Sequence, residues 1–391
     1  MIAPRDETLT WLARLVGFDT TSRDSNLELI SAIADEATRV GLSPRVVPGA
    51  EGRKANLVIT VPAADGGTGA GVMLAGHVDC VPVDGQDWSS DPFRLTTRDG
   101  LVYGRGTADM KGFDAAVVAA LPDMTRTPLR EPLHLCFTYD EEVGCRGAQP
   151  LVDALHDAGV RPPVCFVGEP TSMRMIRAHK SINVAEVSVT GVSAHSSLTP
   201  DGVNAIEYAA RVVAFHRERS ERWRSEGPFD DAYPVPYTTG SVNRIAGGTA
   251  VNIVPEQCVV TLEWRSLGQL DDAAEISALE NFCAGLEREM RRENPAASVS
   301  VEMVAAAPGL DTPEDAAAVR LGLDLGLQVC PDKVTYGTEA GIYDRAGIST
   351  VVVGPGDIAQ AHKADEFVAL DQLAACDAFV ARLVRHLRAE G

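Results

Sequence analysis

No run of apolar residues in this 391-residue sequence approaches the length of a membrane span. The first seven residues also lack the apolar segment of a secretory signal peptide. Eight cysteines are present without any C-x-x-C pair, and Cys80, Cys136, Cys165 and Cys330 lie in or beside apolar runs. Scattered cysteines of this kind are typical of a reducing compartment rather than of a disulfide framework. We therefore expect a cytoplasmic protein.

Positive charge is scarce in this sequence. It holds 35 lysine and arginine residues against 55 aspartate and glutamate residues, so its net charge is −20. This excess argues against nucleic acid and anionic membrane surfaces as partners. The apolar share of 45% and the charged share of 23% are ordinary for a globular protein. The length suffices for two domains, and no internal repeat is present.

Short apolar runs bounded by turn residues indicate buried strands of a mainly parallel sheet. The main runs are 58–61, 72–76, 133–139, 164–167 and 349–353. Segments with helical spacing lie between them, so we predict an α/β fold with a doubly wound sheet. The helices expected over the whole chain are 6–17, 25–40, 113–124, 147–158, 203–219, 271–292, 313–322, 338–346 and 371–389.

The pattern changes after Lys180, where apolar and polar residues alternate as in half-exposed antiparallel strands. The strands expected there are 182–189, 238–246, 256–265 and 298–304. With two helices they give a β-α-β-β-α-β order, which is typical of a ferredoxin-like unit. We predict that this α+β unit is an inserted lid and dimerisation domain. The expected bounds are 180–309 for the lid and 1–179 with 310–391 for the catalytic domain.

Potential metal ligands follow the predicted buried strands. They are His77 with Asp79, Asp109 on a glycine-flanked loop, Glu141 with Glu142, Glu169 and His362. In doubly wound sheets, ligands bind outside the carboxyl ends of the strands. Two imidazoles with several carboxylates suit zinc, cobalt or manganese. The set is too large for one tetrahedral ion and suits two ions about 3.5–4 Å apart, bridged by a carboxylate.

Most of these residues also have an ordinary structural explanation. His77 and Asp79 point the same way on an extended chain, which fits a metal ligand oriented by a carboxylate or simply a buried, satisfied histidine. Glu141 and Glu142 fit a solvated acidic turn, and His362 fits a surface loop. Their joint occurrence after strands favours the metal site. Adjacent side chains diverge, so one glutamate can bind metal while the other faces the attacking water.

Five segments resemble motifs of the M20 metallopeptidase and deacylase family, in order and nearly end to end. They are GHVD (76–79), GRGTADMKG (104–112), DEE (140–142), GEPT (168–171) and GVSAHSS (191–197). Within that family, other segments are most similar to the acetylornithine deacetylases. These are RAHK (177–180), NIVP (252–255), GTEAG (337–341), GPG (354–356) and HKADEF (362–367).

The resemblance implies roles for individual residues. One metal ion would be held by His77 and Glu169, the other by Glu142 and His362, and Asp109 would bridge them. Asp79 would orient His77, Glu141 would be the general base, and His195 would stabilise the oxyanion from the lid of a partner subunit. The residues expected to bind substrate are Asn252, Arg265, Gly337 and Thr338. The peptide bond after Asp109 is also expected to be cis.

The activity implied by the resemblance is hydrolysis of N2-acetyl-L-ornithine to L-ornithine and acetate, with two zinc or cobalt ions per chain in a homodimer joined through the lid. A desuccinylase acting on succinyl-diaminopimelate is an alternative, which would need extra cationic residues for the second carboxylate. A broader N-acyl-amino-acid deacylase or dipeptidase is another. A non-catalytic binding protein on the same fold predicts losses among the ligands, and none is lost here. Ser181 departs from the glycine expected after His-Lys, which would alter substrate preference.

Overall fold

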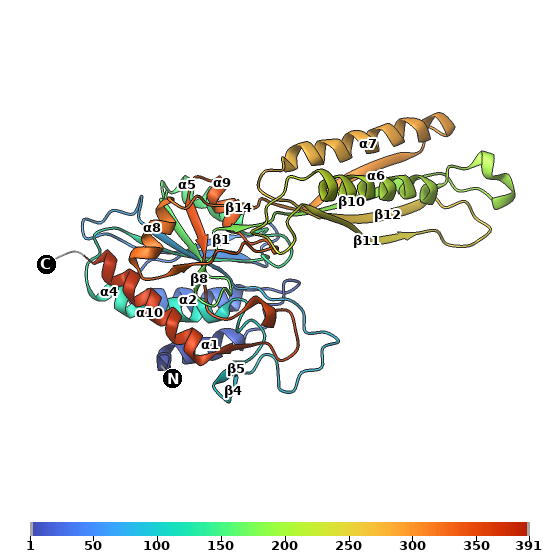
Figure 1. Cartoon of the computed structure of the whole chain (residues 1–391). Coiled ribbons are helices and arrows are strands. Elements are labelled where there is room, and N and C mark those ends of the chain that lie inside the picture. Colours follow the sequence, from blue (N-terminus) through green and yellow to red (C-terminus); the bar gives the residue numbers. More distant parts are fainter. Residues whose placement is uncertain (1–2, 389–391) are drawn as a thin grey trace. The chain divides into compact units, whose positions relative to one another are not determined.

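The computed structural model describes residues 3–388 and divides the chain into two compact units. The first unit comprises Met1–Ala178, Leu310–Lys333 and Thr338–Gly391, and the second comprises His179–Gly309 and Val334–Gly337 (Figure 1). The catalytic domain was expected to end its first segment at residue 179, one residue later than the first unit does. It was also expected to include the segment 334–337, which belongs to the second unit. Among the described residues, no helix is both long and apolar enough to cross a membrane.

A six-stranded sheet forms the centre of the first unit. Its order is β1 (Arg45–Pro48), β2 (Ala55–Val61), β6 (Leu133–Thr138), β3 (Val72–His77), β7 (Val164–Val167) and β16 (Ser349–Val352). The pairs β6–β3, β3–β7 and β7–β16 are parallel, whereas β1–β2 and β2–β6 are antiparallel. Every residue of β3, β6 and β7 is buried, as expected for strands covered on both faces. The predicted doubly wound, mainly parallel sheet is confirmed.

Helices lie on both faces of this sheet (Figure 1). On one face, a continuous apolar core joins the strands to α1 (Asp6–Val16), α2 (Leu27–Arg39), α3 (Lys111–Ala119) and α10 (Leu370–Leu387). The other face carries α5 (Ala148–Asp157) and α9 (Ala340–Arg345). The ring of Phe166 on β7 packs edge-on against Phe379 of α10, with centroids 5.3 Å apart. Two-sided coverage explains why these strands are apolar without alternation.

Several element bounds differ from the prediction. The expected helix 113–124 is divided into α3 and α4 (Leu121–Arg126), because Pro122 has no N–H to continue the hydrogen-bond ladder. The expected helix 313–322 is α8 (Ala317–Asp324). Residue 389, the last of the expected C-terminal helix, lies outside the described residues. A small sheet of β17 (Phe367–Ala369), β5 (Leu101–Tyr103) and β4 (Thr96–Arg98) was not predicted.

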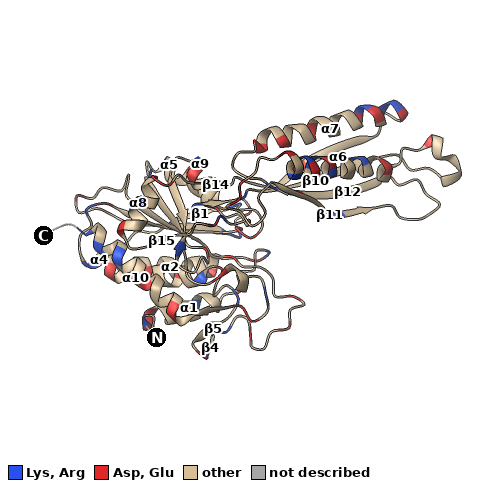
Figure 2. Cartoon of the chain, viewed as in Figure 1, with Lys and Arg blue, Asp and Glu red and all other residues tan. Residues whose placement is uncertain are grey.

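The second unit is an antiparallel sheet with two helices. Its elements are β10 (Ile182–Thr190), α6 (Ala205–Glu226), β11 (Thr239–Gly247), β12 (Gln257–Arg265), α7 (Asp272–Glu293) and β13 (Ser298–Ala307). The spatial order is β11-β12-β10-β13, so the predicted split β-α-β-β-α-β arrangement is confirmed. Alternate residues of β10 and β12 are buried against α6 and α7. Acidic and basic residues are interspersed along these helices (Figure 2), and Arg211 pairs with Glu289 at 2.6 Å.

A buried polar network ties α7 to the sheet of the lid. Asp272 Oδ1 accepts hydrogen bonds from Ser266 Oγ, Trp264 Nε1 and Asn183 Nδ2 at 2.5, 3.1 and 3.0 Å. Ser181 belongs to the same network, because its hydroxyl hydrogen-bonds Ser266 Oγ and accepts from Asn183 Nδ2 at 2.7 Å. The Ser181 hydroxyl is therefore occupied within the lid. This is a structural explanation for a residue that differs from the family pattern.

Replacing Asp272 by alanine leaves three donors without their shared acceptor. We expect this change to destabilise the lid by about 3 kcal/mol, because each buried donor left unsatisfied costs on the order of 1–3 kcal/mol. The matched control is Asp271→Ala, which removes an N-cap that accepts from Ala273 N and Ala274 N and costs about 1 kcal/mol. Hydrogen exchange of the β10 and β12 amides measures the loss of stability in both variants. Equal protection in the two variants contradicts this role for the network.

Candidate metal centre

The carboxyl ends of three parallel strands bring the predicted ligands together in the first unit. His77 is the last residue of β3, Glu141 and Glu142 follow β6, and Glu169 follows β7. His77 is buried, and its Nε2 lies 3.0 Å from Asp109 Oδ1 and 3.6 Å from Glu169 Oε1. Donor atoms of His77, Glu141 and Glu169 all lie within 4.8 Å of one another. Within residues 3–388, this is one of two groups of donors with the spacing of a metal site.

The second group of donors lies beside His362. His362 Nε2 lies 3.0 Å from Glu142 Oε2 and 3.2 Å from Asp109 Oδ2. Donors of His77, Asp109 and Glu142 also lie within 4.8 Å of one another. The two carboxylate oxygens of Asp109 therefore face different histidines, Oδ1 toward His77 and Oδ2 toward His362. That placement suits a carboxylate shared between two ions.

Asp79 holds both the imidazole and the acidic loop in place. His77 Nδ1 lies 3.0 Å from the backbone oxygen of Asp79 and 3.5 Å from its carboxylate. The carboxylate accepts hydrogen bonds from Ser22 Oγ at 2.7 Å and from the backbone N–H of Glu141 at 3.1 Å. Asp79 thus orients His77 mainly through its main chain. Its side chain fixes the start of the loop that carries Glu141 and Glu142.

The electrostatics of the cluster fit divalent cations. Burial raises the pKa of Glu142 to about 7 and holds the pKa values of Glu141 and Glu169 well above their usual range. Burial also opposes ionisation of Asp109, but hydrogen bonds from His362 and His77 lower its pKa. Four crowded carboxylates outnumber the two imidazoles that can neutralise them. Divalent ions coordinated by oxygen and nitrogen atoms would balance this charge.

Glu141 and Glu142 diverge, as expected for adjacent side chains. Glu142 faces His362, whereas the carboxylate of Glu141 lies with His77 and Glu169 and accepts a hydrogen bond from Cys145 Sγ at 3.5 Å. Glu141 therefore lies at the first donor group. Its role as a base rather than a ligand stays a prediction.

The lid carries three of the other predicted residues, at two different places. His195 is exposed, and its Nδ1 accepts a hydrogen bond from Ser197 N at 3.2 Å, which leaves Nε2–H free to donate. Asn252 is next to it, because Ser196 N donates to Asn252 O at 3.0 Å. Arg265 lies at the opposite end of β12 and donates from Nε to Glu263 Oε1 at 3.1 Å.

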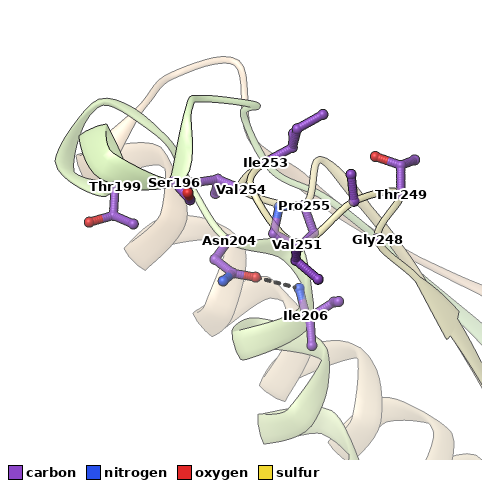
Figure 3. Close-up of a pocket in the computed structure, with 11 residues that line it drawn as sticks. Ser196, Thr199, Asn204, Ile206, Gly248, Thr249, Val251, Ile253, Val254 and Pro255 are labelled. Atoms are coloured by element: carbon purple, nitrogen blue, oxygen red, sulfur yellow. Dashed lines mark hydrogen bonds between the residues drawn. The ribbon is translucent and has the colours of Figure 1, made fainter.

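A pocket in the lid is lined in part by Ser196, the residue that follows His195 in the sequence (Figure 3). Its lining includes Ser196, Asn204, Ile206, Val251, Ile253 and Pro255. Val251 is fully exposed, and Ile206 and Ile253 are also exposed apolar side chains. The Asn204 side chain accepts a hydrogen bond from Ile206 N at 3.0 Å and caps α6. This end of the lid thus combines an outward-facing histidine with an apolar surface.

Gly337 and Thr338 were predicted to bind substrate. Gly337 lies in the second unit and Thr338 in the first. Thr338 is buried, and its hydroxyl accepts a hydrogen bond from Ala340 N at 3.0 Å at the start of α9. Their role toward a substrate stays a prediction.

Comparisons with known proteins identify the family. The sequence profile of Peptidase family M20/M25/M40 matches residues 73–386. The chain belongs to this peptidase family. An acetylornithine deacetylase from Myxococcus xanthus is 36% identical over 382 residues, which is 96% of each chain. Another from Pasteurella multocida is 34% identical over 349 residues, which is 89% of this chain and 87% of the relative.

Solved structures of the M20 family share the fold. A metallo-carboxypeptidase from Sulfolobus solfataricus superposes with a TM-score of 0.73 at 15% identity, covering 97% of this chain and 99% of that one. A dinuclear metal-binding M20 peptidase from Bacillus subtilis gives a TM-score of 0.63 at 15% identity, covering 97% of both chains. The predicted family is confirmed. M20 peptidases are metal-dependent hydrolases, and the chain is an enzyme of this class.

Sequence reasoning overlooked residues that support this M20 site from outside. Ser22 donates to Asp79, and Gln86 donates from Nε2 to the backbone oxygen of His362 at 3.1 Å. Arg105 and Glu366 lie inside quoted motifs, but no function was assigned to them. Neither Ser22 nor Gln86 follows a buried strand, so no pattern in the sequence distinguishes them from ordinary loop residues. The peptide bond between Asp109 and Met110 is cis, as predicted.

Replacing Asp109 by alanine removes the carboxylate that faces both histidines. We expect the affinity for divalent ions to fall by more than about 100-fold, because loss of a supporting residue alone costs 10–100-fold. Calorimetric titration of metal-free protein with Zn²⁺, followed by metal analysis after dialysis, measures this. Asp91→Ala is the control, because Asp91 is an exposed aspartate that caps a turn through Phe93 N. Two tightly bound ions with normal turnover in Asp109→Ala would contradict the shared site.

Proposed function

We propose that this M20 enzyme is a two-metal amide hydrolase that removes the acetyl group from N2-acetyl-L-ornithine, giving L-ornithine and acetate in arginine biosynthesis. The observation that carries the proposal is the position of Asp109 between His77 and His362, with Glu141 beside the first donor group. Relatives named acetylornithine deacetylase, 34–36% identical over most of the chain, support the choice of substrate. The unpaired cysteines, of which seven are buried, support a reducing cytoplasm as its location.

His77 and Glu169 would hold one zinc or cobalt ion, Glu142 and His362 the other, and Asp109 both. Such ions lower the pKa of water toward neutrality and polarise a carbonyl group. Glu141 would accept the proton of the attacking water on its carboxylate and transfer it to the leaving amine. His195 would donate its Nε2–H to the oxyanion that develops on the former carbonyl oxygen. Arg265 and Asn252 would bind the substrate carboxylate.

The geometry of the lid supports a homodimer. His195 and Asn252 lie beyond the Gln257 end of β12, and Arg265 closes its other end. β12 has nine residues. The eight intervals between them, at roughly 3.3 Å each, span about 26 Å, which is far longer than an N-acyl amino acid. One small substrate therefore cannot contact His195 and Arg265 of the same lid. We infer that the partner subunit's His195, with the partner subunit's Asn252 beside it, completes the site that contains Arg265.

The lid also offers a surface for this pairing. β11 is an edge strand of the lid sheet, and an exposed row of unpaired backbone groups can associate with another chain. Ile245 of β11, Val251, Ile253 and Leu198 are exposed apolar side chains on this unit. A second copy of the lid would cover both the edge and these side chains. The dimer would thus bury the apolar surface beside His195.

Side-by-side turnover of three substrates tests the activity. With Zn²⁺ or Co²⁺ added, we expect N2-acetyl-L-ornithine to give the highest kcat/KM, above succinyl-diaminopimelate and a dipeptide. Preference for the succinyl substrate or the dipeptide overturns the proposed substrate.

Substitution of Glu141 tests its role as a base. Glu141→Gln should keep its metal content and fold while activity falls by about 10²–10⁴-fold, the typical effect of losing a positioned base. Loss of an ion in Glu141→Gln would instead make Glu141 a ligand and exchange its role with Glu142.

A mixed dimer tests sharing of the active site. One subunit carries Glu141→Gln and the other His195→Ala, each nearly inactive as a homodimer. In the mixed dimer, the site with intact Glu141 receives the intact His195 of its partner, so activity should recover toward half of the wild-type value. Differently tagged, co-expressed subunits allow the heterodimer to be purified and assayed. No recovery in a verified heterodimer rules out sharing.

A further inference from the structure

A second buried carboxylate organises the loop that carries Asp109. Glu366 lies immediately before β17 and is almost fully buried. Its Oε1 accepts hydrogen bonds from the backbone N–H groups of Ala108 and Asp109 at 2.9 and 3.1 Å. Its Oε2 accepts from Gly106 N at 3.1 Å and from Arg105 Nη1 at 2.6 Å. One side chain thus binds four donors of a loop that belongs to neither a helix nor a strand.

Arg105 connects Glu366 to the loop that carries His362. Its guanidinium is buried, lies 5.1 Å from the ring centre of Trp88 and donates from Nη2 to Gln86 Oε1 at 2.6 Å. Gln86 in turn donates from Nε2 to the backbone oxygen of His362 at 3.1 Å. A continuous chain of hydrogen bonds therefore runs from the main chain of Asp109, through Glu366, Arg105 and Gln86, to the main chain of His362.

The loop that carries His362 needs such support. The main chain of His362 has φ +63°, in the left-handed region that costs a residue with a Cβ atom roughly 1–2 kcal/mol. Its imidazole is half exposed, so packing alone does not fix it. Surrounding contacts must hold a strained residue in its conformation. Gln86 provides such a contact at the carbonyl group of His362, and Glu366 does the same at the N–H of Asp109.

We propose that Glu366, Arg105 and Gln86 are positioning residues that set the metal affinity of this site. Glu366 places Asp109, which both ions would share, whereas Gln86 places His362, which only one ion would use. Loss of Glu366 then weakens both binding events, and loss of Gln86 weakens one. The inference rests on the two-metal site proposed above.

Metal titration of the metal-free, full-length protein tests the proposal. Wild-type protein should bind two Zn²⁺ ions in a competition titration against a chromophoric chelator. Glu366→Gln keeps the size of the side chain but replaces one acceptor oxygen with an NH₂ group that cannot accept. We expect both affinities to fall by about 10–100-fold, the usual effect of losing a residue that supports metal ligands. Gln86→Ala should lower only one affinity to that extent.

The matched control is Asp377→Asn, which lies elsewhere in the same unit. Asp377 is also a buried carboxylate that accepts from a backbone N–H, that of Arg5 at 2.8 Å, and from Thr8 Oγ1 at 2.6 Å. Its loss should lower the melting temperature without changing either Zn²⁺ affinity. Metal affinity therefore separates a positioning role from a general loss of stability.

The possible results are distinct. If wild-type protein binds fewer than two ions, the two-metal site fails and the inference fails with it. If wild-type protein binds two ions and folded Glu366→Gln binds both with wild-type affinity, only the positioning role is overturned. Equal weakening of both ions in Gln86→Ala overturns its assignment to His362. Should Glu366→Gln not fold, Arg105→Lys replaces it, because lysine has one nitrogen in place of the two, Nη1 and Nη2, that donate to Glu366 and Gln86. Wild-type affinities in that variant overturn the proposal.

Discussion

A cluster of buried carboxylates places the main electrostatic constraint on the first unit. Asp109, Glu141, Glu142 and Glu169 lie around two imidazoles, and burial disfavours their ionised forms. Such a group persists only where rigid elements hold each member. Parallel strands provide this, because β3, β6 and β7 end at the same edge of the sheet. Helices on both faces exclude water from those strands and hold them in place, so the carboxylates meet at one edge of the sheet.

Residues outside the donor cluster hold the ligand-bearing loops in place. Asp79 joins His77 to the loop of Glu141, and Glu366 joins the loop of Asp109 to Arg105. These contacts act mainly on backbone groups. Loops can therefore present ligands with the precision that strands provide elsewhere, because their N–H and C=O groups are held by buried side chains rather than by a ladder.

The lid poses a different problem, since its functional candidates lie at two ends of one strand. His195 and Asn252 occupy one end of β12 and Arg265 the other, so a small ligand cannot join them within one copy. The polar network around Asp272 keeps α7 attached to the sheet that separates them. This division of groups between two ends of the strand is the reason for proposing an active site shared between two subunits.

The sequence by itself determined the layout of the elements and the composition of the site. Buried strands appear in the sequence as apolar runs, and the strands of the lid appear as alternating apolar and polar residues, because burial imposes these patterns locally. His77, Glu141 and Glu169 stand out as polar residues that follow buried strands. Only the tertiary structure decided which loop residues support the ligands. Gln86 and His362 are 276 positions apart, and Arg105 and Glu366 are 261 apart. Contacts of this range depend on how loops pack after the sheet has formed, and no local periodicity records them.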